Sequence, residues 1–166
     1  MAVDQTLFET IHTRIGTQRT HQLGEVTGVL IRRYARAIGE TDPIHYDTAY
    51  ARRQGYADVV APANLVTAVS VWDEGPPTED LREDGTPAAA LEDLAPDGVR
   101  VMGGGEDMEF HRPITAGTTV EERSTMTDVE LRAGRSGPVI VVSYCHEFTD
   151  AAGRLLVTTT RKLLLR

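Results

Sequence analysis

The chain has 166 residues, a formal net charge of −8 at pH 7 and 40% hydrophobic residues. This length suits one domain that can bury a core unaided, so we expect a single domain over residues 1–166. The acidic balance argues against nucleic-acid and anionic-membrane partners, and the lone Cys145 excludes an intrachain disulfide. With no signal-peptide pattern and no apolar run of roughly 18 residues, we expect a cytoplasmic protein.

The first half of the chain has one strand followed by helical spacing. Residues 19–26 have strand composition. Apolar residues then recur at helical intervals from Thr27, a typical N-cap, to Gly39, which suits the position after a helix. Asp47 predicts the cap of a second, short helix that ends before Gly55.

A third helix is predicted over residues 62–72, because proline is favoured at the first helical position and Pro62 opens the segment. This segment is apolar on nearly every side, so it must be covered, and a sheet is the only candidate. Residues 73–98 are acidic and rich in proline, which predicts a long loop with at most one helical turn at 88–94. Such loops are commonly functional lids or mobile segments, and both interpretations stay open.

After Val99 the composition changes to that of strands. Glycines 103–105 interrupt the first candidate strand, which predicts a bulge or a close approach of the backbone to a ligand. Together the elements predict an α+β fold, an antiparallel sheet of about five strands around a long central helix. The four candidate strands of this half are residues 100–112, 118–131, 139–149 and 154–165, with hairpin turns at 134–137 and 150–153.

The densest cluster of reactive side chains lies in residues 39–47 and includes Glu40, Asp42, His45 and Asp47. A carboxylate and an imidazole on either side of a rigid proline turn can act on one small volume. Such a pair suits general acid–base chemistry on water. The same acids are also typical turn and cap residues beside which the histidine would simply pack, and spacing alone leaves both interpretations open.

Three segments carry a family resemblance. Residues 34–47 read Tyr-Ala-Arg-Ala-Ile-Gly-Glu-Thr-Asp-Pro-Ile-His-Tyr-Asp, residues 61–65 read Ala-Pro-Ala-Asn-Leu, and residues 109–117 read Glu-Phe-His-Arg-Pro-Ile-Thr-Ala-Gly. They resemble the MaoC-like (R)-specific enoyl-thioester hydratases and dehydratases, most closely the branch similar to the dehydratase of type I fatty-acid synthase. The resemblance spans nearly the whole chain apart from the acidic loop, and it implies a single hot-dog domain.

The resemblance also implies catalytic residues. His45 occupies the position of the family's catalytic histidine. Glu40 stands where the family has an aspartate, and Asp42 stands where it has an asparagine. The first change keeps the carboxylate but lengthens the side chain by one methylene, and a misplacement of about 1 Å can cost on the order of a hundredfold in rate.

The binding residues implied by the resemblance depart from the family at one position. The family donates a glycine N–H at the start of the central helix to the thioester carbonyl, and the corresponding Pro62 has no N–H. The amides of Ala63 and Asn64 are the expected substitutes. Further candidates for substrate binding are Gly104 for a close backbone approach, and Arg52, Arg53 and Arg112 for an anionic coenzyme A or carrier-protein arm.

The function implied is a hydratase or dehydratase that adds water to, or removes it from, a trans-2-enoyl thioester of coenzyme A or acyl-carrier protein. The conjugated thioester needs no cofactor. No metal is expected either, because His12, His21, His111 and His146 lack metal-ligand spacing. The departures at Glu40 and Pro62 favour one alternative, a non-catalytic hot-dog subunit that pairs with an active MaoC-like chain, while a thioesterase is less favoured.

The assembly implied is a dimer of hot-dog domains, homodimeric by default or formed with another MaoC-like subunit. Residues 139–144 carry few charges, a composition poorly suited to a solvated strand at the edge of a sheet. We therefore expect sheet edges to be covered in a dimer, with each site at the interface. The acyl chain and its pathway, fatty-acid or polyketide, stay open.

Overall fold

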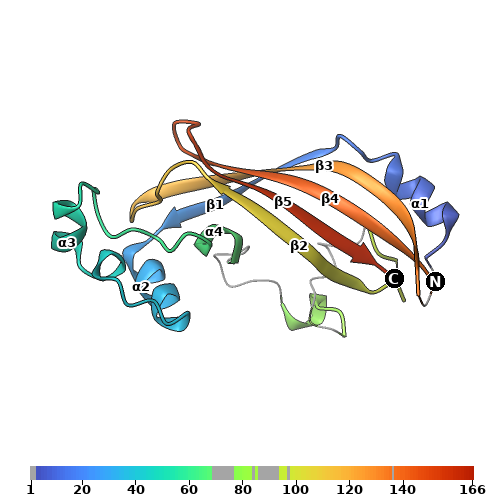
Figure 1. The fold of residues 1–166 in the computed structure, drawn as a ribbon, viewed down its shortest axis with the longest axis horizontal. Helices are drawn as coiled ribbons and strands as arrows, with labels where there is room; N and C mark the ends of the chain where they lie inside the picture. The colour runs from blue at the N-terminus through green and yellow to red at the C-terminus, as the bar shows by residue number, and fades with distance from the viewer. Residues whose placement is uncertain (1–2, 69–76, 84, 86–93, 97, 136) are drawn as a thin grey trace.

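The protein folds as a five-stranded antiparallel sheet that curves around short helices (Figure 1). This computed structural model describes residues 3–68, 77–83, 85, 94–96, 98–135 and 137–166. The strands lie in the order β1-β3-β4-β5-β2, so β1 and β2 form the two edges. Their bounds are Gln18–Val26 for β1, Val101–Phe110 for β2, Thr118–Gly134 for β3, Gly137–Asp150 for β4 and Leu155–Leu165 for β5. The expected α+β fold with five antiparallel strands is confirmed.

The two helices predicted from their caps are present as α2, Gly28–Ala37, and α3, Thr48–Arg53. The Thr27 side chain accepts a hydrogen bond from the Leu30 amide at 3.2 Å, and Asp47 accepts from the first amides of α3. Gly39 and Gly55 follow the two helices with φ of 77° and 93°, a left-handed conformation that glycine adopts without strain.

One helix, α1, Gln5–His12, was not predicted from the sequence. Asp4 caps this helix by accepting from the Leu7 amide at 2.9 Å. Leu7 and Ile11 are its buried residues, and the helix packs against β3 at the opposite end of the sheet from α2 and α3 (Figure 1). The signal was present as an Asp cap followed by apolar residues four positions apart, but it spans only two turns.

The helix expected from Pro62 is described only as α4, Leu65–Ala68. It begins three residues later than predicted, because the Leu65 amide donates to the Pro62 carbonyl at 3.0 Å and closes a turn before the helix. The rest of the predicted helix, residues 69–72, lies outside the described residues, as do residues 88–93 of the predicted turn. In the acidic loop the structure describes a 3-10 turn, η2, Thr78–Asp80.

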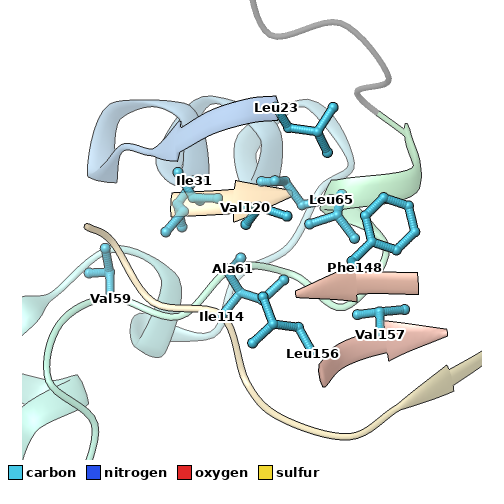
Figure 2. Packing of buried hydrophobic residues seen from close by; sticks show 12 residues of the cluster. Leu23, Ile31, Val59, Ala61, Leu65, Ile114, Val120, Phe148, Leu156 and Val157 are labelled. Carbon is cyan, nitrogen blue, oxygen red and sulfur yellow. The ribbon is translucent and has the colours of Figure 1, made fainter. Parts of the chain in front are cut away.

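Two apolar clusters fill the concave face of the sheet. The first, here called the helix-side cluster, joins α2 and α4 to β3, β4 and β5 (Figure 2). The second, the terminal cluster, joins α1 and the segment 94–99 to the other end of β3, β4 and β5. The interpretation of residues 139–144 as a sheet edge is wrong, because β4 lies between β3 and β5, and residues 140–143 are buried there. Their low charge reflects burial.

The glycine interruption in β2 is a bulge, as predicted. The pairing of β2 with β5 shifts between Gly103 and Gly105, and Gly105 has a φ of 116°. Gly104 lies within the bulge, where an added Cβ would meet the Leu164 and Lys162 side chains at 3.1–3.2 Å. The bulge therefore brings β2 into close contact with β5.

Candidate active site

Backbone hydrogen bonds bring the three family-like segments together. The Val60 amide donates to the Ile44 carbonyl at 3.0 Å, which ties the segment before α4 to the turn that carries His45. The Ala61 amide then donates to the Ile114 carbonyl at 2.7 Å, which ties the same segment to residues 109–117. Segments separated by up to 70 residues in the sequence thus meet at one place.

A cavity of about 330 Å³ lies at this meeting point. Its wall is apolar except for His111 and Arg112. Ala61, Ile114 and Val157 belong both to this wall and to the helix-side cluster (Figure 2), so the cavity opens at the rim of the core. The lining residues are Val60, Ala61, Pro62, Ala63, Phe110, His111, Arg112, Pro113, Ile114 and Val157. Its apolar lining and size suit a small organic group such as an acyl chain.

One strong hydrogen bond joins His45 to Val60, a residue that lines the cavity. His45 is the last residue of the 3-10 turn η1, Pro43–His45, it is half-buried, and its Nδ1 lies 2.6 Å from the carbonyl oxygen of Val60. A carbonyl only accepts, so Nδ1 carries the proton and donates. In the neutral imidazole Nε2 then holds the free lone pair, which makes it the atom able to take up or return a proton.

Glu40 and Asp42 build the turn that positions His45. Asp42 caps η1 by accepting from the Ile44 amide at 2.9 Å. One carboxylate oxygen of Glu40, Oε1, accepts from the Thr41 and Asp42 amides at 3.0 and 3.4 Å, and the Glu40 carbonyl accepts from the Tyr46 hydroxyl at 2.6 Å. Glu40 is exposed, and no hydrogen bond joins it to His45 in the part of the chain that the structure describes. The turn and cap interpretation therefore holds for both acids, and only Oε2 of Glu40 is left for chemistry.

The expected amide donors lie where the cavity meets α4. Ala63 lines the cavity, and both Ala63 and Asn64 are exposed residues that precede the helix. Within the described ranges the amides of Ala63 and Asn64 have no backbone acceptor. The Leu65 amide, by contrast, donates to the carbonyl of the buried Pro62. Both N–H groups are thus available to an oxygen atom of a ligand.

The remaining predicted residues divide between the cavity and other places. Arg112 lines the cavity and is exposed, so it is placed to meet an anion. Arg52 instead lies on α3, where it donates to the Ala57 carbonyl at 3.1 Å and approaches Asp58 at 3.9 Å. Arg53 stacks over Tyr50, and Gly104 lies in the β2 bulge, outside the cavity lining. The structure does not bring Arg52, Arg53 or Gly104 to His45.

A polar pair on the concave face, His146 with Glu122, was not predicted from the sequence. His146 Nδ1 lies 2.6 Å from Glu122 Oε1, and the side chains are only 11% and 19% exposed. The pKa of Glu122 lies below its usual value, chiefly because His146 hydrogen-bonds to its carboxylate; burial opposes this effect. One signal was available, since His146 has the same strand parity as the buried Val142 and Phe148.

The low pKa of Glu122 predicts acid sensitivity. A depressed carboxyl pKa stabilises the fold above the unfolded value of about 4.5, and this stabilisation is lost as the pH falls through the folded value. The urea midpoint of the wild type should therefore fall more steeply between pH 6 and pH 3 than that of Glu122→Gln. Glu25→Gln, at an exposed position of β1, should keep the wild-type slope. Equal slopes for the wild type and Glu122→Gln would contradict the prediction.

The described residues contain neither a metal-ligand cluster nor a membrane-spanning helix. No group of three or more His, Cys, Asp or Glu residues is arranged to hold a metal ion there. No helix within these ranges combines the length and the apolar character needed to cross a membrane.

The sheet order, the short helices on its concave face and the cavity beside His45 define the hot-dog fold of hydratases and dehydratases. Residues 13–159 match the family described as the FAS1-like dehydratase domain region, and the chain belongs to this family. A relative from Thermobifida fusca (strain YX), a UPF0336 protein, is 33% identical over 142 residues, which cover 86% of this chain and 84% of that protein.

Solved structures share the fold at low sequence identity. The C-terminally truncated HadBC complex of Mycobacterium tuberculosis, a 3R-hydroxyacyl-ACP dehydratase, aligns with a TM-score of 0.66 and 19% identity, covering 91% of this chain and 96% of that chain. The unliganded R-hydratase PhaJ1 of Pseudomonas aeruginosa aligns with a TM-score of 0.62 and 17% identity, covering 90% of this chain and 79% of that chain.

Proposed function

We propose that the protein is an (R)-specific enoyl-thioester hydratase or dehydratase, acting on a trans-2-enoyl group carried by coenzyme A or acyl-carrier protein. The observation that carries this proposal is the hydrogen bond from His45 Nδ1 to the carbonyl of Val60, which ties the imidazole to a residue that lines an apolar cavity. Membership of a dehydratase family supports the same chemistry.

The residues around the cavity can divide the reaction between them. In hydration, the Glu40 carboxylate accepts a proton from water as the oxygen bonds to the β-carbon. Nε2 of the neutral His45 orients the water, takes over the proton from Glu40 and returns it to the α-carbon, so that one water molecule is added across the double bond and both side chains recover their starting protonation states. The Ala63 and Asn64 amides stabilise the charge that develops on the thioester oxygen, and Arg112 meets the anionic arm of the carrier. Dehydration is the reverse of these steps.

A second candidate is a non-catalytic subunit that completes an active partner chain. The observation that favours it is the geometry of Glu40, whose Oε1 is engaged by its own turn and which has no hydrogen bond to His45 in the described residues. Pro62, which has no N–H where the family donates one to the thioester carbonyl, favours it too. One structural relative, HadBC, is itself a complex of two subunits. For either function we propose a dimer in which the exposed edges of β1 or β2 are covered by a second hot-dog chain.

One assay separates the two candidates. The purified chain, sized by sedimentation, is mixed with crotonyl-coenzyme A and with longer trans-2-enoyl thioesters, and loss of the enoyl absorbance is followed. Turnover by a homodimer supports the enzyme. Turnover that appears only after co-expression with a second MaoC-like chain supports the subunit. An active species of 18.1 kDa would refute the dimer, and release of free coenzyme A would indicate a thioesterase instead.

A further inference from the structure

A band of polar side chains crosses the middle of the concave face, between the two apolar clusters. Inward-facing residues of β5 run from Val157 in the helix-side cluster to Leu165 in the terminal cluster, yet Thr159 and Arg161 stand between them. Thr159 is only 1% exposed. The residues of this polar band are Glu106 on β2, Glu122 on β3, His146 on β4, and Thr159 and Arg161 on β5.

The charged members of the polar band are paired with one another. Glu122 accepts from His146, as described above, and the guanidinium of Arg161 donates to Glu106 Oε1 at 3.1 Å. The same guanidinium lies 3.4 Å from the Thr67 carbonyl of α4, so the helix lies over this end of the band. These pairs give Glu122, Glu106 and Arg161 a partner each, but they use only one ring nitrogen of His146.

Two buried atoms of the polar band have no hydrogen-bond partner among the described residues, namely His146 Nε2 and Thr159 Oγ1. The two residues are direct partners in the β4–β5 ladder and face the same side, which places their Cβ atoms about 4.5–5.5 Å apart. Buried polar atoms in folded proteins are nearly always hydrogen-bonded, so two adjacent atoms left unsatisfied by the described residues indicate a place for a further polar group, which a bound ligand can supply.

The hydrogen-bonding capacity of the two atoms selects the chemistry of that group. Glu122 accepts from His146 Nδ1, so Nε2 is an acceptor in the neutral imidazole and a donor in the imidazolium, while the Thr159 hydroxyl both donates and accepts. A ligand hydroxyl matches either protonation state, because it can donate to the Nε2 lone pair or accept from Nε2–H. A carbonyl oxygen matches only the imidazolium.

This position lies one inward-facing residue beyond the cavity lining on both β5 and β2. Val157 lines the cavity, and Thr159 is the next inward-facing residue of β5, about 6.8 Å further along the strand. On β2, Phe110 lines the cavity and Met108 is the next inward-facing residue, paired with Thr159. Met108 is half-buried, and its sulfur lies 3.8 Å from the Thr67 hydroxyl. Methionine side chains are flexible, so the Met108 side chain is able to move aside for an acyl chain that extends from the cavity.

We propose that His146 and Thr159 bind a hydroxyl group on the acyl chain of the substrate, and that the protein thereby selects thioesters hydroxylated beyond the double bond. The inference rests on the proposed function, because it takes the cavity as the site of the enoyl group. Glu122 acts as a positioning residue, since it fixes the His146 ring and its tautomer.

The test compares matched substrates. Trans-2-hexenoyl- and trans-2-octenoyl-coenzyme A are assayed against the same thioesters with a terminal hydroxyl, using the form of the protein that turns over enoyl thioesters. We expect kcat/KM to favour a hydroxylated substrate on the order of tenfold or more, because a site built to bind a hydroxyl discriminates against its absence. Thr159→Val should remove the preference. Thr160→Val, one residue along on the exposed opposite face, should retain it.

A second arm separates failure of this inference from failure of the proposed function. The ¹⁵N resonance of His146 Nε2, assigned with His146→Gln, is followed in the full chain as 1-hexanol is added. If no thioester is turned over, the proposed function fails, and a hexanol-dependent shift that is lost in Thr159→Val still supports the hydroxyl site. Equal kcat/KM values within both substrate pairs, or, without turnover, no shift with hexanol, would overturn the inference.

Discussion

Replacing His45 with alanine should lower the turnover of an enoyl thioester by roughly 10²–10⁴-fold, the usual contribution of a positioned acid–base group. The reason lies in the bond between His45 Nδ1 and the carbonyl of Val60, a cavity-lining residue, because this bond orients the ring and leaves Nε2 to exchange protons. The loss of enoyl absorbance with crotonyl-coenzyme A measures the effect, with the protein assayed alone or with the partner that activates it.

Two further variants make the His45 result interpretable. His12→Ala removes an exposed histidine from α1, at the far end of the sheet, and should keep wild-type turnover. Glu40→Gln keeps an oxygen for the Thr41 and Asp42 amides but removes the carboxylate, so a large loss here would assign proton transfer to Glu40. Wild-type turnover by His45→Ala would refute the role given to this histidine.

The sequence predicts the parts of the site better than their internal geometry. The family-like segments identify which stretches of chain build the cavity, and the backbone bonds of Val60 and Ala61 bring those stretches together. The direction of each carboxylate depends on competition between nearby donors, which spacing does not determine. Glu40 is an example, because the Thr41 and Asp42 amides of its own turn donate to its carboxylate.

The polar band shows why strand patterns alone do not predict which side chains meet. At the hairpin between β3 and β4, Gly134 pairs with Gly137. If this register continued along both strands, Glu122 would lie opposite Thr149, on the other face of the sheet from His146. A bulge between Met126 and Asp128 shifts the register by one residue, which turns Glu122 to the concave face. No glycine or proline marks this bulge, so the sequence carried no local sign of it.

The order of the strands in the sheet could not be predicted from their composition either. The sequence located the five strands to within a few residues, but low charge alone cannot separate a buried central strand from a strand covered by a partner chain. β4 is central because its hairpins with β3 and β5 place a strand on each side of it. The edges left for a partner are β1 and β2, and the arrangement of these two strands depends on contacts between distant parts of the chain.

The second large effect concerns the stability of the fold. Leu165 is fully buried in the terminal cluster, where it pairs with Ile140 of β4 and Val101 of β2. Its neighbour Leu164 points to the opposite face and is only half-buried. Leu165→Ala should therefore lower the free energy of unfolding by about 2–5 kcal/mol, because it removes buried methyl groups and leaves a cavity among side chains from four elements.

Leu164→Ala is the matched control, and we expect it to cost less than about 1.5 kcal/mol, since a half-exposed side chain loses less contact and water fills the space. Chemical denaturation of the two variants, compared by midpoint and slope, measures both values. If Leu164→Ala lowered the free energy of unfolding more than Leu165→Ala, then Leu164 and not Leu165 would face the terminal cluster. Such a result would contradict the register on which both the terminal cluster and the inward direction of Thr159 depend, because side chains alternate along the strand.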